Sequence, residues 1–158
     1  MLTRREALYG VGGVPLAAGE VANAALMDDG PQAALLAFLH AFENCDLARM
    51  EAAFARGATY FDRAPREPGN PALYRRGTGM PDGMRQIAST LPKTVPGPPY
   101  HRLEPRNLAC ERHGEIALCT FELDSADSLG RRTIALRQQA YGWKIIHIHA
   151  SNVYGGAT

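Results

Sequence analysis

The sequence predicts an α+β fold in which three N-terminal helices pack against an antiparallel sheet. Apolar residues recur at helical spacing between residues 31 and 91, whereas strand-like alternation dominates from residue 100 onward. Turn residues divide this second half into segments of the length expected for a meander. The 158 residues suit one domain with one core, and no internal repeat divides them.

The three helices are predicted from apolar faces and start signals. The first covers residues 31–44, and its apolar residues at i, i+3, i+4 and i+7 are Leu35, Phe38, Leu39 and Phe42. Asp46 is typical of an N-cap for a second helix, with Leu47, Met50 and Phe54 facing inward and Arg56-Gly57 as its end. Residues 81–83 open the third helix.

The strands follow from β-type runs and from the breakers between them. Residues 58–62 form the first run. Residues 63–80 hold three prolines and three glycines, so we expect a loop at the mouth of a cavity. The four prolines of residues 92–99 exclude regular structure there. The meander is expected at residues 100–111, 115–124, 131–141 and 143–153.

The last predicted strand carries two histidines one residue apart. Strict alternation places His147 and His149 on the same face as Trp143 and Ile145. The opposite face also carries apolar residues, which indicates a strand covered on both sides for part of its length.

Composition excludes several classes of function. A formal charge of +1 gives no general attraction to nucleic acid or to membranes. No apolar run approaches the roughly 18 residues of a membrane span. We therefore expect neither a nucleic-acid partner nor a membrane span.

Residues 1–24 have the order of an export signal. Thr3-Arg4-Arg5-Glu6-Ala7-Leu8 resembles a twin-arginine signal, a mildly apolar stretch follows, and Ala22-Asn23-Ala24 offers a cleavage site. This predicts a periplasmic or secreted protein whose mature chain begins near Ala25. The alternative is an amphipathic N-terminal helix of a cytoplasmic protein. With residues 1–24 as the export signal, residues 25–158 form the single folded domain.

The three cysteines follow no metal-binding or redox spacing. Cys110 and Cys119 are expected to flank a hairpin without lying directly opposite each other. The sequence favours three small buried residues, although export would allow one disulfide.

The ending Gly142-Trp-Lys-Ile-Ile-His-Ile-His-Ala-Ser151, with Thr78-Gly79-Met80 before the third helix, carries a family resemblance. Over residues 31–153 the chain resembles the nuclear transport factor 2-like superfamily. It is most similar to the SnoaL-like group and to the association domain of calcium/calmodulin-dependent kinase II. The resemblance implies a cone-shaped fold: a strongly curved sheet around a pocket, in a homodimer or larger homo-oligomer built through the sheet.

The resemblance also implies a candidate base. Ala58-Thr59-Tyr60-Phe61-Asp62 matches the context of the ketosteroid isomerase aspartate, so Asp62 could move a proton of a bound substrate. In the alternative, Asp62 ends the strand and pairs with Arg63, Arg66 or solvent. The isomerase pattern is incomplete, because Phe38 stands where those enzymes have a donating tyrosine. The pocket arginines of the kinase domain are also unmatched, with Glu122 at one position and Arg137 only near another. Arg131, Arg132 and Arg137 could form a basic patch, but we favour a solvated edge of the sheet.

Three interpretations of the histidine pair remain open. His-x-His on a strand can bind metal, but no third ligand follows at a set spacing, although His101, Glu122 or Asp62 could complete a site in space. The pair could act in acid-base chemistry with Asp62 and Tyr60, as in dehydratases of the superfamily. We favour the third interpretation, in which both histidines belong to the sheet signature and bond neighbouring strands or a dimer partner.

The sequence therefore predicts a protein that binds a small, mostly apolar molecule in the cone, with no metal and no cofactor. An enzyme of this kind would catalyse isomerisation, dehydration or cyclisation. The predicted catalytic residues are Asp62, His147 and His149. The predicted ligand-binding residues are Phe38, Tyr60, Tyr100, His101, Glu122 and Arg137. The alternative is a non-catalytic assembly domain.

Overall fold

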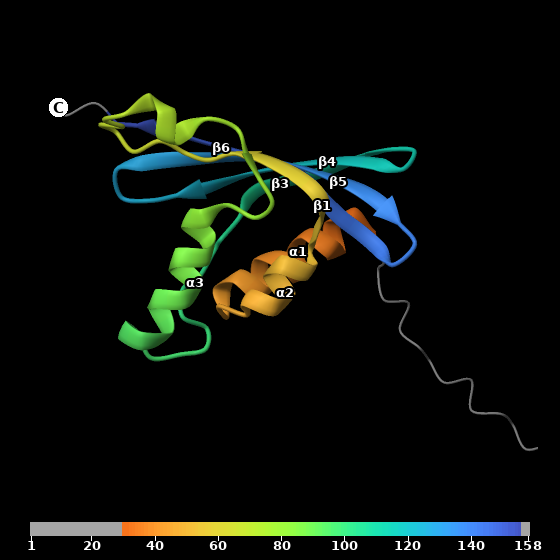
Figure 1. Cartoon of the computed structure of the whole chain (residues 1–158), viewed down its shortest axis with the longest axis horizontal. Coiled ribbons are helices and arrows are strands. Elements are labelled where there is room, and N and C mark those ends of the chain that lie inside the picture. Colours follow the sequence, from red (N-terminus) through yellow and green to blue (C-terminus); the bar gives the residue numbers. More distant parts are fainter. Residues whose placement is uncertain (1–29, 156–158) are drawn as a thin grey trace, which may run out of the picture.

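The computed structural model describes residues 30–155. The predicted export signal lies outside these residues. The helices are α1 (Pro31–Glu43), α2 (Leu47–Ala52), the short 3-10 helix η1 (Pro71–Tyr74) and α3 (Asp82–Thr94). The strands are β1 (Phe54–Phe61), β2 (Gly77–Thr78), β3 (Arg106–His113), β4 (Ile116–Asp124), β5 (Ser128–Gln139) and β6 (Gly142–Tyr154). In Figure 1, α1, α2 and α3 lie on one face of the sheet, as predicted for an α+β fold.

The sheet is mixed, so the prediction of an antiparallel sheet is wrong in one pairing. Its strand order is β2-β1-β6-β5-β4-β3. Strands β3 to β6 form the predicted antiparallel meander, and β2 pairs antiparallel with β1. The last strand, β6, returns beside β1 and runs parallel to it. The strong curvature of the sheet stays a prediction.

The first two helices form largely as predicted. Pro31 opens α1, where its missing N–H costs no helical hydrogen bond. Asp46 caps α2, its carboxylate accepting the Arg49 N–H at 3.1 Å. However, α2 ends at Ala52, and Phe54 begins β1 rather than continuing the helix. Gly57, at a φ of +76°, lets the strand absorb a register shift there, and the Phe54 ring still packs edge-on against Phe38.

Two boundaries around the proline-rich segment differ from the prediction. Helix α3 includes Pro92 and ends two residues later, because a proline near the C-terminus of a helix removes only one late hydrogen bond. Strand β3 begins at Arg106 rather than at residue 100. The preceding segment is bound to the end of α1 instead: the Tyr100 N–H donates to the Glu43 carbonyl at 2.8 Å. A short η1 and β2 interrupt the predicted loop of residues 63–80.

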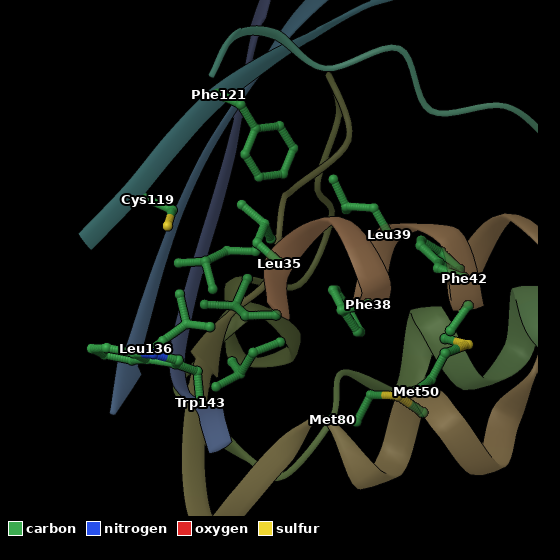
Figure 2. Close-up of a cluster of buried hydrophobic side chains, with 14 of the residues drawn as sticks. Leu35, Phe38, Leu39, Phe42, Met50, Met80, Cys119, Phe121, Leu136 and Trp143 are labelled. Atoms are coloured by element: carbon green, nitrogen blue, oxygen red, sulfur yellow. The ribbon is translucent and has the colours of Figure 1, made fainter. Parts of the chain in front are cut away.

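The core lies between the helices and the sheet. In Figure 2, side chains from α1 meet Cys119, Phe121, Leu136 and Trp143 of the sheet. The largest fully buried side chains include Leu35, Met50, Ile134, Leu136, Ile145 and Ile148. Each such side chain contributes roughly 1.5–3 kcal/mol by leaving water, so this layer dominates the stability of the fold.

A bulge in β6 reverses the predicted faces of the last strand. Leu136 of β5 pairs with Ile145, but the preceding Ala135 pairs with His147, so Ile146 is an extra residue. Trp143 and Ile145 are buried toward the helices, and beyond the bulge Ile148 and Ala150 take that direction. The prediction that the histidines share a face with Trp143 and Ile145 is therefore wrong, because one inserted residue flips every later side chain.

The β3–β4 hairpin is closed by a disulfide. Cys110 lies directly opposite Cys119, with their Cα atoms 4.0 Å apart, and their sulfurs are bonded. The expected offset between these cysteines is wrong, because a turn at Gly114 and Glu115 pairs His113 with Ile116. Gly114 has the positive φ of +62° that such a tight turn requires. Cys45 is a free thiol.

Candidate functional site

An apolar cavity of about 270 Å³ lies between the sheet and the helices α1 and α3. Its apolar lining comes from α1, α3, the segment before β3, and the inward positions of β4, β5 and β6. Asp62, Arg63, His101 and Arg132 add its charged and titratable groups. The cavity residues are Phe38, Leu39, Phe42, Asp62, Arg63, Gly83, Met84, Ile87, His101, Leu103, Phe121, Leu123, Arg132, Ile134, Ile148 and Ala150.

Asp62 is half-buried at this cavity, in the first position after β1. One carboxylate oxygen accepts the backbone N–H of Arg63 at 2.8 Å. The other faces Gly83 in the first turn of α3, where a Cβ atom would lie 3.2 Å from it. Asp62 therefore lies at the cavity and bonds the backbone of Arg63, and no ion pair with Arg63 or Arg66 forms within the described residues.

Arg132 is one of two cations, with Arg63, that line the cavity and that the sequence prediction did not assign to it. Its Nη1 donates to the carbonyls of Arg131 and Ser151, both at 2.9 Å, and to Oδ1 of Asn152 at 3.3 Å. Its Nη2 also donates to Asn152 Oδ1, at 3.3 Å. Burial lowers the pKa of Arg132, and the positive charge of Arg63 lowers it further. Electrostatic interactions with Asp62 and Tyr154 raise the pKa of Arg132 and so offset part of this lowering.

A missing side chain makes room for this guanidinium group. A Cβ atom on Gly130 would lie 2.9 Å from Nη2 of Arg132, closer than real contacts of that kind. The sequence did contain a signal for the inward position of Arg132. Arg132 lies two and four residues before Ile134 and Leu136, so it faces the same side of the strand as these two buried residues. Arg131 and Arg137 face the other side and are exposed. The expected solvated patch of three arginines is wrong for Arg132.

His101 forms part of the cavity wall, and its binding of a ligand stays a prediction. Its Nε2 lies 2.8 Å from the carbonyl oxygen of Phe42, a contact in which the ring N–H donates. The two rings also meet edge-on, with centroids 4.7 Å apart. These contacts fix the imidazole against the end of α1 and leave it half-buried.

A second cavity of about 270 Å³ adjoins the first and is more polar. The two share Arg63, Leu103, Leu123 and Arg132. The second cavity brings together four arginines and two carboxylates: Arg63, Arg102, Arg106, Arg132, Glu104 and Asp124. Arg106 and Asp124 form an ion pair with N and O atoms 3.2 Å apart. Arg132 therefore stands at the junction of an apolar and a polar chamber.

Four of the predicted ligand-binding residues do not line the apolar cavity. The Tyr60 ring lies against Gly77 of β2 and packs on the core. Tyr100 is held at the end of α1 by its backbone. Glu122 accepts a hydrogen bond from the Asn107 side chain at 2.7 Å, and Arg137 is exposed. Phe38 and His101 are the two predicted ligand-binding residues found in the lining.

The histidine pair lies on the sheet face that points away from the helices, which we call the outer face. There His147 Nδ1 and Thr59 Oγ1 form a hydrogen bond of 2.8 Å. Phe61 lies beside both imidazoles, with centroid distances of 5.9 Å to His147 and to His149. Neither histidine lines the cavity that contains Asp62, so the structure separates the predicted acid-base set. In the part of the chain from residue 30 to 155, no group of three or more His, Cys, Asp or Glu could hold a metal ion.

Comparisons with known proteins agree with this fold. The family model of the SnoaL-like domain matches residues 32–155. No match was found among curated proteins. Within residues 30–155, no helix is long and apolar enough to cross a membrane.

Three solved structures illustrate the likeness. A candidate dehydratase of the nuclear transport factor 2-like family from Streptomyces avermitilis is 20% identical, with a TM-score of 0.56, over 77% of this chain and 92% of that one. A candidate ketosteroid isomerase from Parabacteroides distasonis is 20% identical, with a TM-score of 0.54, over 81% and 92%. A candidate calcium/calmodulin-dependent protein kinase type II association domain from Thiobacillus denitrificans is 21% identical, with a TM-score of 0.56, over 78% and 94%. At these identities the likeness concerns the fold alone.

Proposed function

The chain belongs to the SnoaL-like domain family, and we propose that it binds a small, mostly apolar molecule in the cavity beside Asp62 and Arg132. The observation that carries this proposal is the lining itself, in which one carboxylate, two arginines and a histidine meet an otherwise apolar wall. Ligand sites commonly combine apolar walls with a few placed polar groups. The volume equals that of about nine water molecules at roughly 30 Å³ each, which suits a ligand of similar heavy-atom count.

The same site supports proton chemistry on the bound molecule. Asp62 supplies a carboxylate that can accept a proton. Arg132 supplies a fixed cation that can stabilise negative charge as it develops. We propose these two residues for isomerase-, dehydratase- or cyclase-type chemistry, with Asp62 as the base. The histidines fit this scheme poorly because they lie on the outer face.

The test is native mass spectrometry of the chain purified from its own host. We expect a retained small molecule, and we expect Ala150→Phe to abolish its retention, because Ala150 is buried in the cavity lining. The matched control is Ala109→Phe, which adds the same ring at an exposed position of β3. Two results together would rule out a ligand site here: no small molecule is retained by the purified chain, and Ala150→Phe does not change the affinity for apolar probes.

A second candidate function is assembly, favoured by the apolar residues of the outer face. Phe61, Leu118 and Val153 are 38%, 42% and 47% exposed. Phe61 and Leu118 lie on either side of the histidines in the sheet, since His147 pairs through Ala135 to Leu118. Exposed apolar side chains of this kind suit a protein interface. We propose that this face joins two copies of the chain, with His147 and His149 at the contact.

The disulfide supports the proposal of export. Disulfides persist in oxidising compartments and are rare in reducing cytoplasm. Cys110 and Cys119 are bonded across a hairpin. Fractionation of the host should therefore place the protein outside the cytoplasm, with its N-terminus near Ala25. Full-length protein confined to the cytoplasm would contradict the proposal.

A further inference from the structure

Arg132 forms no ion pair with a carboxylate within the described part of the chain, although the charge of Asp62 acts on it from nearby. Four ion pairs occur between residues 30 and 155, and none includes Arg132. The acceptors of its hydrogen bonds are two backbone carbonyls and the amide oxygen of Asn152, which are all neutral. The charge of Asp62 offsets the burial of Arg132 only in part, since the pKa of Arg132 is still lowered, and a bound anion would recover more of this free energy.

The hydrogen bonds of Arg132 leave one edge of its guanidinium group available. They use Nη1 three times and one N–H of Nη2. Nε–H and the second N–H of Nη2 lie side by side on the other edge, and these are the two donors that a carboxylate accepts in a bidentate pair. No described residue accepts a hydrogen bond from Nε. The nearby carboxylate of Asp62 bonds the Arg63 N–H instead.

We propose that the ligand is an amphipathic carboxylate, whose carboxylate binds Arg132 while its apolar part fills the cavity. This inference rests on the proposed function and adds the chemical class of the ligand. The polar chamber on the other side of Arg132 supports it, because its lining has four arginines against two carboxylates. The Gly130 position supports it too, since it gives space to the guanidinium group where a side chain would displace it.

The size of the apolar chamber sets the probes. A volume near 270 Å³ suits roughly nine to ten heavy atoms at about 30 Å³ each. Octanoate and phenylacetate have this size, and octan-1-ol and 2-phenylethanol match them without the charge. Octylamine carries the opposite charge on the same apolar chain. Together they separate the contribution of the head group from that of the apolar body.

The experiment is isothermal titration of the purified chain with each probe. Octanoate should bind roughly 10- to 100-fold more tightly than octan-1-ol, which is the range expected of charge-assisted hydrogen bonds. Arg132→Gln should remove this preference, so that octanoate binds no more tightly than octan-1-ol. The matched control, Arg131→Gln, changes the neighbouring arginine on the outer face and should keep the preference.

A variant that keeps the charge covers the case in which Arg132→Gln fails to fold. Arg132→Lys retains a cation without the planar pair of donors, so its preference for octanoate should fall several-fold. Thermal unfolding of each variant establishes that it is folded before titration. A Lys variant with the full preference of the wild type would show that the bidentate contact is absent.

The outcomes separate the inference from the proposed function. Equal binding of octanoate and octan-1-ol, repeated with the phenyl pair, overturns the carboxylate inference while the apolar site stands. Tighter binding of octylamine than of octanoate overturns it in favour of Asp62 as the anchor. Failure of every probe to bind the wild-type chain counts against the proposed function, and the inference fails with it.

Discussion

The two faces of the sheet differ in what their polar residues contact. On the helix side, Asp62 and Arg132 line an apolar cavity, and their hydrogen bonds go to other groups. On the outer face, His147 bonds Thr59 and lies beside Phe61, and His149 is exposed. The comparison teaches that a polar residue of a strand reaches the cavity only if the alternation of side chains points it toward the helices, whatever its chemistry. Histidine is the more common catalytic residue, but here the arginine points toward the cavity and the histidines point away from it.

The largest difference between the two faces should be in stability. Leu136→Ala removes a side chain that is 1% exposed on the helix side, and we expect it to lower the free energy of unfolding by about 2–5 kcal/mol. Leu118→Ala, at 42% exposure on the outer face, should cost less than about 1 kcal/mol in the monomer. Denaturant titration of both variants at low protein concentration measures this. Equal losses would mean that the outer face is covered as fully as the core.

The disulfide lies in the hairpin at the far edge of the sheet, and its loss should come next in size. A loop closed over a separation of 9 residues stabilises the chain by about 2.5 kcal/mol in the chain-entropy estimate. Reduction of the wild type with dithiothreitol should lower the free energy of unfolding by this amount. The double variant Cys110→Ala with Cys119→Ala serves as control, because dithiothreitol should not affect it. An unchanged wild type after complete reduction would refute the stabilising role.

The assembly proposal can be tested without touching the cavity. Phe61→Asp places a charge on the outer face, where Phe61 is 38% exposed, and should convert a dimer to a monomer in sedimentation or light scattering. Ligand retention should survive, because Phe61 does not line the cavity. A substitution of similar character at the exposed Leu73, outside the sheet, is the control and should leave the dimer intact. A wild-type chain that is already monomeric would end the assembly proposal.

The smallest expected effect concerns the histidine hydrogen bond. Thr59→Val removes the hydroxyl that lies 2.8 Å from His147 Nδ1 and should cost about 0.5–1.5 kcal/mol, the usual net value of one such bond. Thr133→Val, on the same face opposite the exposed His149, is a matched control. Neither change should alter ligand retention. If Thr59→Val loses the ligand and Thr133→Val keeps it, His147 contributes to ligand binding after all.

Much of the fold could be predicted from the sequence because it depends on local patterns. The apolar spacing of α1, the cap at Asp46 and the antiparallel meander require only helical periodicity, a short polar side chain and alternation. Phe38, Asp62 and His101 line the cavity, and their roles in catalysis or ligand binding stay predictions. Arg132 could have been assigned from its phase with Ile134, but three arginines close together suggested a solvated patch.

The sequence by itself determined the order of helices and strands, and which helix faces and sheet residues are apolar. Only the tertiary structure decided the bulge at Ile146, the parallel pairing of β1 with β6, and the exact opposition of Cys110 and Cys119. Periodicity is a property of neighbouring residues, whereas register depends on what each strand meets across the sheet. One extra residue in β6 preserves its composition but reverses its later side chains. For this reason the two histidines lie on the outer face of the sheet and not in the cavity.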